Sequence, residues 1–263
     1  MQQHDAQAET TTTTIATTRD DGPYQSSARR RSNRRAAAPA LTHVTPQPFV
    51  DPIARVKRES IHWKRKVFHV IGISTVALTY ALTQVTQMEA LAILGVVAFI
   101  FSGLDLLRFY VPSLNKKVRE DFGPFMRDYE LNSLSGSTWF FFSGLLAIAL
   151  FPKVAVSLGV LALALGDPLA SWVGLRWGKT RLPGGKSLEG SITFFVVSAV
   201  AGSALLAFTP GLTLGAGAIV LLAAVTGLVA AFAEWLPIKG VDDNFVVPLA
   251  AGGAGAAMLA LIG

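Results

Sequence analysis

Seven long apolar runs fill the chain after residue 66, and short polar or glycine-rich segments separate them. The pattern predicts membrane spans at about 67–86, 89–107, 137–152, 154–174, 191–208, 212–235 and 245–262. A bilayer core requires about 20 apolar residues per crossing helix, and most of these runs reach or approach that length. A soluble domain would have to bury all of them in one small core. We therefore predict an all-α, polytopic transmembrane helical bundle.

The first 54 residues have the opposite character. They contain a threonine run (Thr10 to Thr14) and an arginine-rich segment (Arg29 to Arg35), with no apolar stretch that would suit a secretory signal. We expect a disordered basic tail over 1–54, lying against anionic headgroups, ahead of a transmembrane catalytic domain over 55–263. A transit peptide or a nucleic-acid-binding tail is the alternative. We expect no nucleic-acid partner.

The distribution of positive charge predicts an orientation. Of the 23 Lys and Arg residues, all but Lys153 lie in the first 66 residues or in the segments 108–136, 175–190 and 236–244. These segments alternate with short, nearly uncharged connections, as the positive-inside rule requires if the N-terminus is cytoplasmic. The expected location is a plasma membrane in a prokaryote, or an endoplasmic reticulum or plastid membrane in a eukaryote. The chain has no cysteine, which excludes disulfides and thiolate metal sites.

Polar clusters flank the predicted spans on the same face. From Glu59 to His69, helical spacing would align His62, Lys66 and His69. This is typical of a basic run beside a membrane. It would equally suit a phosphate clamp in which Arg65 and Lys66 hold phosphates and His69 handles a proton.

Asp167 lies inside the fourth predicted span, where an ionisable group is costly and usually marks function. Its carboxylate could hold Mg²⁺, which prefers oxygen ligands. The loop 175–190 that follows is rich in glycine and carries Lys179 and Lys186, and Ser187 is a good N-cap for the next helix. The positive end of that helix would then face an anion. The plainer interpretation is a basic loop with turn glycines.

Two further clusters have equally plain alternatives. Asp242 and Asp243, followed by Asn244, could bind a divalent cation or simply begin a helix. Arg127 and Glu130 are spaced for an ion pair, and the alternative is contact with a substrate at the membrane edge.

Together these residues resemble the CTP-dependent lipid kinases, which include dolichol kinase, phytol kinase and the CTP-type diacylglycerol kinase, and which are related to phosphatidate cytidylyltransferases. The resemblance covers about residues 59–262 in order, with Pro248 and Gly252 after the last motif. The matching segments are Arg65-Lys66-x-x-His69, Met126-Arg127-x-x-Glu130-x-Asn132, Gly166-Asp167-x-x-Ala170, Lys186-Ser187-x-Glu189-Gly190-Ser191 and Asp242-Asp243-Asn244.

The resemblance implies transfer of the γ-phosphoryl group of CTP to a membrane lipid alcohol, with Mg²⁺ or a similar cation. Diacylglycerol is favoured by the segment from Met126 to Gly136, ahead of phytol, polyprenol or dolichol. Oligomeric state stays open, including a homo-oligomer.

The resemblance also implies residue roles. They are the metal ligands or base Asp167, Asp242 and Asp243; the nucleotide-binding Lys179, Lys186, Ser187, Glu189 and Gly190; the triphosphate contacts Arg65, Lys66 and His69; and the substrate or structural residues Arg127, Glu130 and Asn132.

Three other functions remain open. A cytidylyltransferase that makes CDP-diacylglycerol also uses CTP, but its signature has Thr where this chain has Ser187, and the element from Arg65 to His69 favours the kinase. A transporter would suit an intramembrane Asp167, although charge confined to one side suits it poorly. A non-catalytic scaffold is the third.

Overall fold

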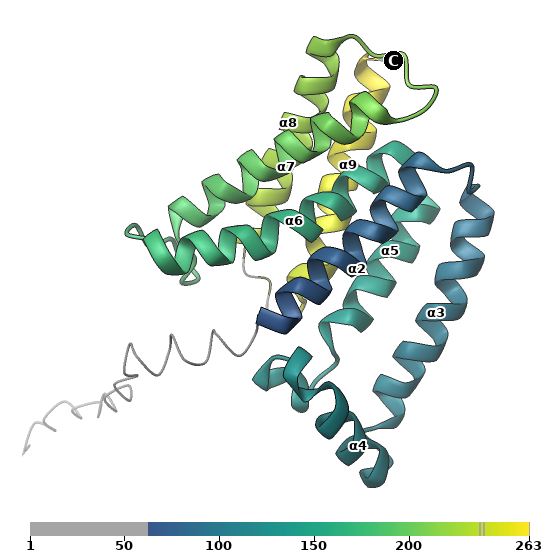
Figure 1. Cartoon of the computed structure of the whole chain (residues 1–263), viewed down its shortest axis with the longest axis vertical. Coiled ribbons are helices and arrows are strands. Elements are labelled where there is room, and N and C mark those ends of the chain that lie inside the picture. The colour runs from purple at the N-terminus through teal and green to yellow at the C-terminus, as the bar shows by residue number, and fades with distance from the viewer. Residues whose placement is uncertain (1–62, 237, 239, 263) are drawn as a thin grey trace, which may run out of the picture. The chain divides into compact units, whose positions relative to one another are not determined.

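The computed structural model describes residues 63–236, 238 and 240–262. The predicted tail, together with Glu59 and His62, lies outside them. Helices form most of the described chain (Figure 1). They are α2 (Trp63–Leu82), α3 (Gln87–Leu107), α4 (Pro112–Phe122), η1 (Gly123–Phe125), η2 (Asp128–Leu131), α5 (Gly136–Leu150), α6 (Lys153–Trp177), α7 (Leu188–Phe208), α8 (Ala216–Trp235) and α9 (Asp243–Ile262).

Each predicted span coincides with one helix, and local capping explains where several helices begin. Thr86 accepts a hydrogen bond from the backbone N–H of Glu89 at 3.2 Å, while the Glu89 carboxylate accepts one from the Thr86 N–H at 2.8 Å. This reciprocal cap starts α3. Ser135 caps α5 by accepting from the N–H of Thr138.

The first span differs most from its prediction, because α2 begins at Trp63, ahead of the apolar run. Arg65 and Lys66 therefore lie on the helix itself, one turn from His69, rather than in a flanking segment. The predicted loop 108–136 also contains α4, a short helix that begins with Pro112, a residue suited to the first turn.

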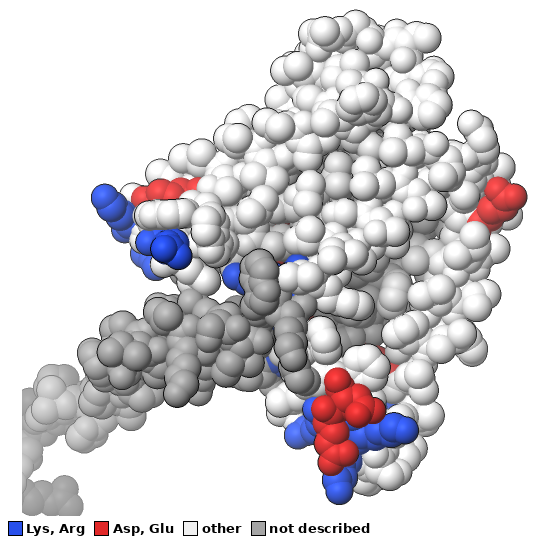
Figure 2. All heavy atoms as spheres, viewed as in Figure 1, with Lys and Arg blue, Asp and Glu red and all other residues white. Residues whose placement is uncertain are grey.

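In the described part of the chain, five helices are long and apolar enough to cross a membrane, namely α3, α6, α7, α8 and α9. The apolar α5 has 15 residues and is shorter. On the face shown in Figure 2 most of the surface carries no charge, and charged side chains gather near α4 and near the α6–α7 connection. These features support an integral membrane protein. The count of about seven spans and the cytoplasmic N-terminus remain predictions.

Helix α6 lies at the centre of the bundle, where it packs against α2, α7, α8 and α9. Its glycines allow close approach. A Cβ atom on Gly159 would lie 2.7 Å from the carbonyl oxygen of Pro248 and 2.9 Å from the nitrogen of Gly252 on α9. On the α7 side, the ring of Phe194 covers Gly166. Asp167 is thus carried on the most enclosed helix of the bundle.

Candidate active site

Arg127, in the connection between η1 and η2, joins two of the predicted acidic residues. Its Nη1 donates to Asp242 Oδ2 at 3.1 Å and to Asp243 Oδ1 at 3.4 Å. Burial opposes the charged guanidinium, but Asp243, Asp167 and Asp242 outweigh it and raise the pKa of Arg127 above its usual value. Segments more than 100 residues apart in sequence therefore meet at one cation.

The start of α9 is organised around Asp242. The Tyr129 hydroxyl donates to Asp242 Oδ2 at 2.7 Å, and Asp242 Oδ1 accepts from the backbone N–H of Asn244 at 2.9 Å, which caps the helix. Burial, followed by the charge of Asp243, raises the pKa of Asp242 to about 6. Burial also raises the pKa of Tyr129 to about 12. The hydrogen bond from the Asn244 N–H agrees with the helix-cap interpretation of these acids in the case of Asp242.

Lys186 approaches the same acids from the α6–α7 connection. Its Nζ donates to the side chain and to the backbone carbonyl of Glu234, and it lies 4.0 Å from Asp243 Oδ2. Glu234 is buried near the end of α8. Asp243 thus lies between Arg127 and Lys186, in a site that carries fixed charges of both signs.

Asp167 is half-buried on α6. Within the described part of the chain no hydrogen bond or ion pair involves its carboxylate. It is nonetheless close enough to interact electrostatically with His69, Arg127 and Glu234. A carboxylate near two basic groups and without a direct partner is available to an incoming cation.

The carboxylate oxygens available here fit a magnesium ion whose coordination is completed by phosphates of the substrate. Among the described residues no three Asp, Glu or His side chains converge on one point, so the predicted trio of Asp167, Asp242 and Asp243 does not form a closed metal site. Mg²⁺ is commonly held by one or two carboxylates together with substrate phosphates. Asp167 and Asp243 suit that arrangement, whereas Asp242 is already bound by Arg127, Tyr129 and its own helix.

The Glu130 carboxylate stabilises the surrounding backbone and does not pair with the Arg127 guanidinium. Its carboxylate accepts hydrogen bonds from the backbone N–H groups of Arg127 and Gly136, at 2.8 and 3.1 Å, and lies 3.4 Å from Arg65 Nη1. The ion pair that spacing suggested for Arg127 and Glu130 is absent from the described contacts, because the two side chains point to different partners. A Cβ atom on Gly136 would lie 2.5 Å from Asn244 Nδ2, so only glycine leaves room there.

Arg65 and His69 form the α2 side of the site, and Lys66 lies beside them on the helix. The Nε2 atom of His69 is buried and has no hydrogen-bond partner among the described residues. The same holds for Arg65 Nη1, whose contact with Glu130 is electrostatic. Leaving a buried polar atom without a partner is costly, so a polar ligand that reached these two atoms would gain hydrogen bonds.

The predicted nucleotide-binding loop is a tight turn between α6 and α7. Gly184 and Gly185 both have positive φ angles, which glycine adopts readily. The buried Ser187 caps α7 by accepting from the N–H of Gly190 at 3.1 Å. Glu189 accepts from the N–H of Thr180 at 3.1 Å. Ser187 and Glu189 therefore shape the loop.

The side chains of the two remaining predicted residues have no hydrogen bond or ion pair with the acidic residues of the site among the described residues. Lys179 is exposed on the loop. The side-chain oxygen of Asn132 accepts from Arg119 on α4.

Sequence reasoning missed a buried pair beneath the site. Arg108, at the end of α3, is 1% exposed, and its Nε donates to Asp105 at 2.7 Å. Its Nη2 donates to the carbonyls of Glu130 and Ser133, both at 2.7 Å. The pair fixes the segment that carries Arg127 and Glu130. Asp105 lies inside the second predicted span, and an ionisable residue at such a position was the signal in the sequence that could have revealed the pair.

Comparisons with known proteins place these residues in context. The chain is 29% identical to CTP-dependent diacylglycerol kinase 1 of Schizosaccharomyces pombe, over 57% of this chain and 71% of the relative. It is 26% identical to the protein of the same name from Saccharomyces cerevisiae, over 75% and 77%. It is 31% identical to the phytol kinase of Synechocystis, over 76% and 78%. No family model and no solved structure matches the chain.

Proposed function

The chain belongs to the family of CTP-dependent lipid kinases, and on this basis we propose that it transfers the γ-phosphoryl group of CTP to the hydroxyl of diacylglycerol. Two of the relatives above are diacylglycerol kinases by name, and the third is a phytol kinase. Phytol is therefore the second candidate acceptor.

The observation that carries the proposal is the meeting of Arg127, Lys186, Asp243 and Asp167 beside His69, whose Nε2 has no hydrogen-bond partner among the described residues. Phosphoryl transfer requires mainly positioning and stabilisation of charge on the phosphates. Arg127, Lys186 and Arg65 are cations that can hold a triphosphate. Lys186 lies in the loop between α6 and α7, whose conformation depends on Ser187, Glu189 and Gly190. Lys179 lies on the same loop.

A divalent cation such as Mg²⁺ would be held by Asp167 and Asp243, and when bound it would neutralise charge on the β- and γ-phosphates. His69 lies near Asp167 and has no partner on Nε2 among the described residues, so it can accept a hydrogen bond or a proton from the lipid hydroxyl. Lys66 follows Arg65 on α2, and Asn132 follows η2.

The test is the fate of the label in two parallel reactions. The purified full chain, in vesicles that contain both dioleoylglycerol and unlabelled dioleoylphosphatidic acid, the acceptors of a kinase and of a cytidylyltransferase, is supplied with CTP labelled either at the γ- or at the α-phosphate. The proposal predicts labelled phosphatidic acid from γ-labelled CTP alone. Labelled CDP-diacylglycerol from α-labelled CTP would instead identify a cytidylyltransferase, and the absence of any labelled lipid from either nucleotide would contradict both functions.

A further inference from the structure

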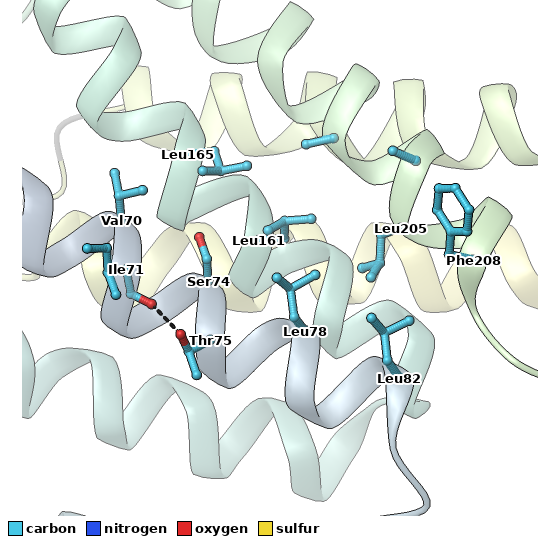
Figure 3. Close-up of a pocket in the computed structure, with 12 residues that line it drawn as sticks. Val70, Ile71, Ser74, Thr75, Leu78, Leu82, Leu161, Leu165, Leu205 and Phe208 are labelled. Carbon is cyan, nitrogen blue, oxygen red and sulfur yellow. Dashed lines mark hydrogen bonds between the residues drawn. The ribbon is translucent and has the colours of Figure 1, made fainter.

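An apolar groove of about 550 Å³ runs between α2, α6 and α7. Figure 3 shows side chains that line it, among them Val70, Ser74 and Leu78 of α2, Leu165 of α6 and Phe208 of α7. Ala204 of α7 also lines the groove. Polar atoms are few in this wall. Thr75 Oγ1 donates to the carbonyl of Ile71 at 2.7 Å, and Ser74 Oγ is buried without a hydrogen-bond partner among the described residues, so the accessible wall is almost entirely apolar. The chemistry of the wall therefore suits hydrocarbon.

One end of the groove adjoins the candidate active site. Val70 follows His69 on α2, and Leu165 precedes Asp167 by two residues on α6. The other end is formed by Leu82 and Phe208, the last residues of α2 and α7. The groove thus begins within one helical turn of the residues where phosphoryl transfer is proposed to occur.

The length of the groove matches one lipid chain. From Val70 to Leu82 it follows α2 for about 18 Å at 1.5 Å per residue. One leaflet of a hydrocarbon core is about 15 Å deep, half of the roughly 30 Å of the whole core. A second apolar cavity of about 300 Å³, lined by Tyr80, Ile93 and Gly144, lies on the other side of α2 and its lining does not include Val70.

We propose that this groove holds one acyl chain of the diacylglycerol acceptor and thereby presents the hydroxyl to His69 and Asp167. The proposal rests on the function proposed above and adds the place where the lipid binds. Ala204 is a small residue in the α7 wall of the groove. Burial of several methylene groups there would supply affinity that a short chain cannot obtain.

The test uses Ala204→Trp, which fills the groove from an exposed position and leaves the catalytic residues unchanged. Val200→Trp is the matched control, since Val200 lies one turn earlier on α7, is 66% exposed and does not line the groove. With γ-labelled CTP, kcat/KM is measured for dioleoylglycerol and for dioctanoylglycerol. We expect Ala204→Trp to lower kcat/KM for the long-chain lipid by about tenfold or more relative to the short-chain lipid. Val200→Trp should leave the ratio unchanged.

A second readout is independent of turnover. A diacylglycerol with a diazirine in one acyl chain is photolysed in vesicles without CTP, and the labelled peptides are identified by mass spectrometry. Labelling of 70–82 and 201–208 that Ala204→Trp removes and Val200→Trp retains supports the groove. Equal effects of both variants on labelling and on the chain-length ratio would overturn it. Labelling in the groove by a chain that phosphorylates no lipid alcohol would leave the groove standing and refute the proposed function.

Discussion

At the scale of single residues, the site consists of charged side chains that bind one another or the backbone. Arg127 binds Asp242 and Asp243, Glu130 binds backbone N–H groups, and Arg108 beneath them binds Asp105 and backbone carbonyls. Each of these charged side chains has a partner of opposite sign or several hydrogen bonds, as burial requires.

Substitution of Arg108 tests whether its buried contacts stabilise the fold. Arg108→Ala would leave Asp105 without its cation and remove the donors to the carbonyls of Glu130 and Ser133. We expect a loss of about 3–5 kcal/mol in the free energy of unfolding. Arg119→Ala is the control, because exposed Arg119 also reaches this loop but should cost no more than about 1 kcal/mol. Denaturation in detergent measures both, and equal losses would show that Arg108 is not a structural anchor.

The sequence identifies most residues of the site but not their partners. The motifs indicated Asp167, Arg127, Lys186 and the acids at 242–243, because each is a polar group next to an apolar run. The alternative pairing of Arg127 and Glu130 was drawn from spacing along one segment, whereas the structure pairs both with distant residues. Long-range partners such as Glu234 and Lys186 are set by how helix ends meet, which local spacing does not specify.

At the scale of elements, apolar runs predict the helices well because each run is long and is bounded by caps. The boundaries of α2 could not be predicted, since its first turn is polar and hydropathy alone places the start later. The packing of α6 against α9 was likewise not visible in the sequence, although it depends on Gly159 and Gly252.

Gly159 tests the contact between these two helices. In Gly159→Ala the new methyl group would lie under 3.0 Å from the α9 backbone, so the helices must separate. We expect a loss of about 1–3 kcal/mol. Gly95→Ala is the matched control, since nothing lies within 4 Å of a Cβ atom there, and its effect should be neutral or a gain of up to about 1 kcal/mol from helix propensity. If Gly159→Ala proves as stable as Gly95→Ala in thermal unfolding, the close approach is not required.

At the scale of the whole molecule, a charged site at the ends of several helices is combined with apolar surfaces that suit a membrane. The orientation follows from the distribution of Lys and Arg and stays a prediction. It places the site and α4 on the cytoplasmic side, and the short connection at 209–211 on the other side.

Because the chain has no cysteine, single cysteines can report this orientation. We expect an impermeant maleimide added to intact cells to label Pro210→Cys and to label Lys116→Cys only after permeabilisation. Both positions are exposed, so access decides the result. Labelling of Lys116→Cys in intact cells would reverse the orientation.

The most direct test of the central claim is magnesium-dependent binding of CTP to the full chain and to Asp167→Asn. No hydrogen bond or ion pair among the described residues depends on Asp167, so the variant should keep the unfolding temperature of the unmodified protein. We expect Mg²⁺ to strengthen CTP binding by the unmodified chain, and Asp167→Asn to weaken that binding by about tenfold or more and to abolish phosphorylation of the lipid. An Asp167→Asn protein that binds CTP with the same magnesium dependence and phosphorylates diacylglycerol at the normal rate would contradict the account.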